Sequence, residues 1–125
     1  MNHPKSNSSE DIKLILEEIK EKAKLIGVIL AAHDGNLIFE NVGHNFKGEK
    51  FSSMYASVVE SATGLGQTIG DRKIEKIITE LDEKTLITVE CSDKTFLTLV
   101  VKNDSNVNKV LIDLQNYIAK LNRLL

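Results

Sequence analysis

The fold of this chain is decided by residues 26–36, which read IGVILAAHDGN. Their first part, residues 26–32, is a continuous apolar run that is too short for a buried helix and is rich in β-branched residues. Such a run is typical of a strand covered on both faces, so helices are expected on both sides of the sheet. Asp34-Gly35-Asn36 then supplies hairpin turn chemistry, because Gly and Asn tolerate positive φ. A second strand is therefore predicted directly after the turn. Alternation places Leu37, Phe39 and Asn41 on one of its faces and Ile38, Glu40 and Val42 on the other.

An amphipathic helix is predicted before this hairpin, from about Glu10 to Lys24. One apolar stripe runs along it at spacings of three and four residues, made of Ile12, Ile15, Leu16, Ile19 and Ala23. Ser8 or Ser9 is the expected N-cap. Residues 1–8 are polar and aperiodic, which predicts a flexible tail before a single domain at residues 9–125.

Residues 43–50 are expected to form a loop, and a second helix is predicted from about Phe51 to Ile69. Its apolar stripe, with spacings of 4, 3, 4, 3 and 4, is expected to face the sheet and comprises Phe51, Tyr55, Val58, Ala62, Leu65 and Ile69. Gly64 and Gly66 lie inside this helix, where a glycine costs about 1 kcal/mol relative to alanine. One explanation is a close approach by another backbone, and the other is a frayed last turn.

Three strands are predicted next, at Lys73–Leu81, Thr85–Ser92 and Thr95–Lys102, and tight turns between them indicate an antiparallel meander. After the loop at residues 103–106, a last helix is predicted from about Asn106 to Leu125. The predicted order is α-β-β-α-β-β-β-α. This is an α/β (α+β) sandwich with a five-stranded antiparallel sheet, the second helix on one face and the first and third on the other.

The composition excludes several classes of protein. The 125 residues suffice for one domain with its own core. A net charge of −2 argues against nucleic acid as the main ligand. The single cysteine, Cys91, excludes an internal disulfide, and its place in an alternating strand indicates a small buried hydrophobe. The chain has no apolar signal segment and no run of about 20 apolar residues, so a cytoplasmic protein is expected.

No segment carries a catalytic or cofactor motif. The glycines at 64, 66 and 70 lack the Lys-Ser/Thr of a phosphate loop and close a helix where such a loop opens one. The three histidines, His3, His33 and His44, share no metal-ligand spacing, although His33 and His44 are able to meet across the hairpin. Neither the Ser52-Ser53 pair nor Cys91 has a base in its local pattern. We therefore expect no enzyme, no metal and no cofactor.

The strand predicted at Lys73–Leu81 is a candidate for the edge of the sheet. An edge strand presents unpaired N–H and C=O groups to other chains. Its charged residues either block that edge or form reciprocal pairs across a two-fold axis. The small residues along the preceding helix favour the second interpretation, because they permit close helix packing. They are Ser57, Ser61, Gly64 and Thr68.

Over residues 10–122 the chain resembles the roadblock/dynein light-chain family, whose fold is related to the longin and profilin-like folds. The resemblance rests on the apolar strand and Asp-Gly turn at residues 27–36, the helix at residues 55–62 that runs on to Gly64-x-Gly66, the meander, and residues 97–101. The length of the chain resembles that of a stand-alone prokaryotic or archaeal member.

The resemblance implies a non-enzymatic protein that dimerises through the second helix and third strand. It also implies that the paired helices form a platform for a small Ras-like GTPase, which the dimer activates or tethers. The interface candidates carried over are Tyr55, Val59, Ala62, Gly64, Gly66, Ile74, Lys76 and Ile78. For Tyr55 and Ile78 a place in the core of their own chain is an equal alternative.

Two other functions stay open: an assembly adaptor without effect on nucleotide turnover, and a small-molecule sensor, against which the dense aliphatic core argues. A second roadblock chain is the alternative to a homodimer. Neither Arg72 nor Arg123 is placed as a convincing catalytic finger, so any activation would act by ordering the GTPase's switch loops.

Overall fold

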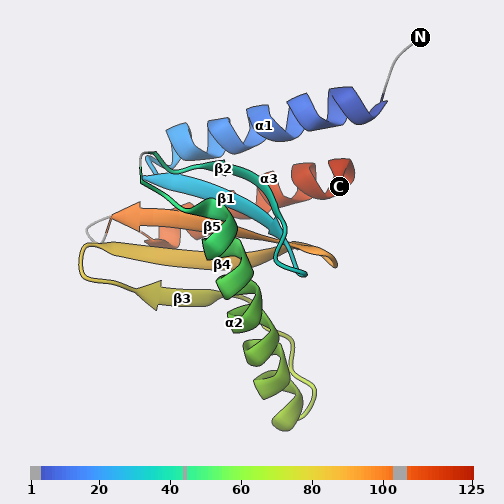
Figure 1. The fold of residues 1–125 in the computed structure, drawn as a ribbon, viewed down its shortest axis with the longest axis vertical. Helices are drawn as coiled ribbons and strands as arrows, with labels where there is room; N and C mark the ends of the chain where they lie inside the picture. The colour runs from blue at the N-terminus through green and yellow to red at the C-terminus, as the bar shows by residue number, and fades with distance from the viewer. Residues whose placement is uncertain (1–3, 44, 103–106) are drawn as a thin grey trace.

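The computed structural model describes residues 4–43, 45–102 and 107–125, and it confirms the predicted order of elements. The helices are α1 (Pro4–Lys22), α2 (Gly48–Thr68) and α3 (Val107–Leu124). The strands are β1 (Gly27–Ala32), β2 (Leu37–Asn41), β3 (Ile77–Glu80), β4 (Lys84–Ser92) and β5 (Thr95–Lys102). They form one antiparallel sheet in the order β2-β1-β5-β4-β3, with α2 across one face and α1 and α3 against the other (Figure 1).

The β1 strand is covered on both faces, as its apolar run predicts. Val28, Ile29, Leu30 and Ala31 are all fully buried. Val28 and Leu30 belong to the larger core beneath α1 and α3, whereas Ile29 and Ala31 face α2. Alternate residues of β1 thus pack on opposite faces of the sheet, so this one strand contributes to the core beneath α1 and α3 and to the core beneath α2.

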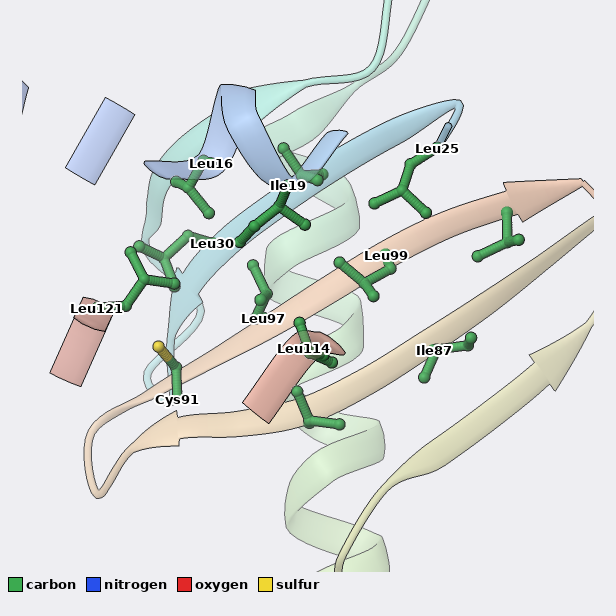
Figure 2. Close-up of a cluster of buried hydrophobic side chains, with 13 residues drawn as sticks. Leu16, Ile19, Leu25, Leu30, Ile87, Cys91, Leu97, Leu99, Leu114 and Leu121 are labelled. Atoms are coloured by element: carbon green, nitrogen blue, oxygen red, sulfur yellow. The ribbon is translucent and has the colours of Figure 1, made fainter. Parts of the chain in front are cut away.

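The larger core joins two helices to the inner strands. Figure 2 shows Leu16 and Ile19 from α1, and Leu114 and Leu121 from α3, pointing toward side chains of β1, β4 and β5. Ile87 and Cys91 on β4 and Leu97 and Leu99 on β5 face this layer, as the predicted alternation requires. On α1, Glu18 and Lys22 form an i,i+4 ion pair at 3.0 Å.

The first helix begins earlier than predicted. It starts at Pro4, where proline's fixed φ suits a first helical turn, so the expected N-cap at Ser8 or Ser9 is wrong. Residues 1–3 lie outside the described part of the chain, and the predicted domain boundary stays a prediction. His44 and the loop at residues 103–106 also lie outside the described residues.

The second strand departs from simple alternation. Leu30 pairs with Phe39 but Ala31 pairs with Leu37, so Ile38 is an extra residue in a β-bulge. The bulge turns Leu37 toward the α2 face and leaves Phe39 on the α1 and α3 face. The prediction that both residues face the same way is therefore wrong.

The second helix begins three residues earlier than predicted and lies with a different row against the sheet. Its buried residues are Ser52, Tyr55 and Val59, all in its first twelve residues. The predicted sheet-facing stripe is wrong beyond Tyr55, because Val58, Leu65 and Ile69 are 41%, 68% and 72% exposed. Figure 1 shows the reason: α2 crosses the sheet and runs on past β3, so its later turns have no sheet beneath them.

Candidate functional site

An apolar row on the free side of α2 is the most prominent surface feature of the described chain. Met54, Val58, Leu65 and Ile69 follow one another at helical spacing and are 41% to 72% exposed; we call them the apolar flank. A helix with apolar rows on two sides is one that packs on two sides. In this chain the sheet covers only one of these rows.

The edge strand β3 lies beside this helix. It pairs with β4 through Ile77–Glu80, and the sheet order places no strand on its other side within the described residues. It is shorter than predicted, because residues 73–76 form no strand. Ile78 and Leu81 are 46% and 51% exposed here, so the edge also carries apolar side chains.

The predicted interface residues separate into two groups. Tyr55 and Val59 are buried within their own chain, where Tyr55 packs on Phe96 and its hydroxyl lies 3.1 Å from Thr79 Oγ1. They therefore offer little area to a partner. The residues that remain at the surface are Ala62 and Ile74, both half-buried, the half-buried Gly64, and the exposed Lys76 and Ile78.

The two helical glycines have different explanations. A side chain on Gly66 would collide with the backbone carbonyl of Arg72, whose N–H donates a 3.0 Å hydrogen bond to the Gly66 carbonyl. The close approach expected from the sequence therefore comes from the same chain, not from a partner. A Cβ on Gly64 would meet nothing within 4 Å, so packing inside the chain does not require glycine there.

The residues that sequence reasoning assigned wrongly are those of the apolar flank. Val58, Leu65 and Ile69 were expected to face the sheet, and Met54 was not considered. The available signal was Val59, which adjoins the predicted stripe at Tyr55 and widens the apolar surface of the helix beyond what one sheet covers.

The described residues show no metal site, since no three His, Cys, Asp or Glu side chains among them are close enough to hold an ion. Nor does the described part of the chain contain a helix long and apolar enough to cross a membrane.

Cys91 is expected to be inert in the folded protein. Burial raises the pKa of its thiol to about 11, against a weaker opposing hydrogen bond with Thr95. At pH 8 only about one thiol in a thousand is then ionised, and the thiolate is the reactive species. We expect a disulfide reagent such as DTNB to label the native chain at least about a hundredfold more slowly than the chain unfolded in guanidinium chloride. Equal rates in the two states would contradict this placement of Cys91.

Comparison with known proteins identifies the fold. No family model and no curated protein matches the sequence. Among solved structures, Myxococcus xanthus MglB is similar with a TM-score of 0.87 and 18% identity, over 93% of this chain and 88% of that one. A structure described as MglB with tetrameric arrangement has a TM-score of 0.82 and 16% identity, over 99% and 91% of the two chains. A roadblock/LC7 domain from Streptomyces avermitilis has a TM-score of 0.79 and 11% identity, over 86% and 92%. At these identities the likeness concerns architecture, and it confirms that this chain has the roadblock/LC7 fold.

Proposed function

We propose that two copies of this chain pair through α2 and β3 and form a platform that binds and regulates a small Ras-like GTPase. The observation that carries the proposal is the apolar flank, which leaves three large aliphatic side chains, Val58, Leu65 and Ile69, in water beside an open strand edge. Contiguous apolar surface of this kind marks an interaction site. A second copy supplies the same surface in return, as a two-fold interface requires.

The β3 edge suits the same pairing. Two β3 strands meeting antiparallel about a two-fold axis at Ile78 would place Lys76 of each copy opposite Glu80 of the other. Opposite charges in cross-strand positions stabilise such a pair modestly. Continuing the sheet across both chains would also satisfy the outward backbone groups of β3. A stable dimer of this kind is expected to bury about 1,600 Å² in total.

The fold of the chain is the reason for proposing a GTPase as its partner. Roadblock-type chains are expected to present their paired α2 helices to a GTPase, and this α2 has an uncovered outer side along its whole length. One similar structure is of an MglB in a tetrameric arrangement, which supports self-association for this architecture. We propose no catalytic residue and no cofactor for this chain, and we propose that it is a cytoplasmic protein. The alternative is an adaptor that assembles complexes without changing GTP turnover.

Sedimentation velocity over a concentration series tests the dimer. We expect a mass of twice 13.9 kDa. GTP hydrolysis by the Ras-like GTPases of the same genome, measured with and without the dimer, then separates regulator from adaptor. A faster turnover supports regulation, and binding without any change supports the adaptor. A stable monomer that binds none of them would refute the platform.

A further inference from the structure

The turn between β3 and β4 is acidic and exposed. Residues 80–84 read ELDEK, so three carboxylates stand beside one lysine, and all five residues are exposed. They line a hollow in the surface, where the side chain of Leu81 is 51% exposed. We call residues 80–84 the acidic turn. Such a surface suits a partner that offers positive charge next to apolar side chains.

The segment that leads from α2 into β3 has the opposite charge. Residues 72–76 read RKIEK, so three cations stand beside one carboxylate. All four charged residues are exposed, and Ile74 between them is half-buried. We call residues 72–76 the basic segment. Figure 1 shows that the chain here returns along the overhanging end of α2, beyond the edge that β3 forms. The basic segment therefore lies on the side from which a second copy would approach β3.

The two charged surfaces do not neutralise each other within one chain. They lie at opposite ends of β3, which keeps them apart. Among the residues that the structure describes, ion pairs involve none of Lys73, Lys76, Glu80 and Glu83. The fold of a single chain therefore gives no reason for opposite charges at the two ends of this strand.

Antiparallel pairing of two β3 strands brings the acidic turn and the basic segment together. In such a pair the end of each strand lies beside the start of the other. A two-fold axis at Ile78 therefore places the acidic turn of each copy beside the basic segment of its partner. Glu80 then lies opposite the partner's Lys76, and the same register carries Glu83 toward the partner's Lys73. Each contact occurs twice, because a two-fold interface repeats every contact.

We propose that docking of the acidic turn on the basic segment makes the chain select a second copy of itself as its partner. The inference rests on the proposed dimer and names its composition, a homodimer in place of a pair with another roadblock chain. A chain with other charges at these positions would meet like charge at one of the contacts, which disfavours the mixed pair. Exposed ion pairs contribute little singly, so the selection depends on several pairs that symmetry repeats.

Charge reversal at the two ends of β3 tests the proposal. Glu80→Lys with Glu83→Lys makes the turn basic, and Lys73→Glu with Lys76→Glu makes the segment acidic. Each double variant alone is expected to raise the dissociation constant of the dimer at least about tenfold at about 50 mM salt, because its homodimer brings like charges together. At about 1 M salt the difference from wild type is expected to shrink to about threefold or less. All four positions are exposed, so the variants are expected to keep their fold, which circular dichroism checks.

An equimolar mixture of the two double variants is the decisive sample. In the mixed dimer each turn again faces a segment of opposite charge, so sedimentation velocity is expected to show dimers about as stable as those of the wild type. Glu10→Lys with Glu21→Lys, at exposed positions on α1, gives the same net charge as the basic-turn variant and is the matched control. This control is expected to dimerise like wild type by itself. Mixed with the acidic-segment variant, it is expected to restore less dimer than the basic-turn variant does.

Two results would overturn the inference. If the wild type dimerises and both double variants dimerise as tightly at low salt, the turn and the segment do not meet, and the dimer stands without this contact. If the mixture of the two variants restores no more dimer than the mixture with the α1 control, charge at these sites does not select the partner. A wild-type chain that stays monomeric would instead refute the proposed dimer itself, and this inference with it.

Discussion

Leu65→Glu is expected to convert the dimer into a monomer at micromolar concentration. Leu65 is 68% exposed in the single chain, so the substitution removes little from the fold of the monomer. In the proposed dimer the same position is buried, and symmetry places two carboxylates in the apolar contact. Each lost leucine costs about 1.5–3 kcal/mol and each buried charge costs more, so association should weaken at least about a hundredfold.

Sedimentation velocity measures this change, and circular dichroism shows whether the variant keeps its fold. Ile112→Glu is the matched control, because Ile112 is 73% exposed but lies on α3. This control is expected to remain dimeric. Ala62→Arg, at a half-buried position on α2, is expected to act like Leu65→Glu. A Leu65→Glu protein that sediments as a dimer would show that the apolar flank is not the interface.

Gly66→Ala is expected to destabilise the chain by about 1–3 kcal/mol, although alanine is the better helix former. The added methyl group collides with the backbone carbonyl of Arg72, and a backbone atom cannot move aside as a flexible side chain would. The collision also strains the hydrogen bond from the Arg72 N–H to the Gly66 carbonyl, which fastens the chain after α2 to the end of that helix.

Gly64→Ala provides the control within the same helix. Its methyl group meets nothing, so it is expected to stabilise the chain by about 0.5–1 kcal/mol. Urea unfolding of both variants at equal concentration, where both sediment with the same mass, measures the difference. Loss of stability in both, or in neither, would contradict the contrast between the two glycines.

The sequence predicts the order of elements because each relies on a local pattern. The run at residues 26–32 is apolar throughout, and the two faces of β1 are indeed buried. The turn at Asp34-Gly35-Asn36 is equally local, with Gly35 at a φ of +97° and the Asp34 carboxylate accepting from the Asn36 N–H. The paired strands β4 and β5 likewise follow from alternation and a short turn.

What the sequence does not predict depends on contacts between distant segments. The apolar stripe through Val58 and Leu65 has perfect helical spacing, but spacing cannot show that the sheet ends beneath the middle of α2. The bulge at Ile38 arises from pairing with β1, and nothing local marks it. A cleft lined by His33 and α2 forms only when the end of β1 meets α2, so no local pattern in the sequence marks it.

The two edges of the sheet are unequal, and this limits how large an assembly can grow. At the β3 edge the strand is regular, so a second copy is able to continue the sheet. At the β2 edge the bulge at Ile38 breaks the repeat of backbone groups that a further strand would have to match. Among the described strands, pairing through β3 therefore uses the regular edge of each chain and leaves the two bulged β2 edges at the ends of the shared sheet. Growth of the sheet by strand pairing is therefore closed at two copies, and a continuous fibre of sheets joined edge to edge is not open to the proposed dimer.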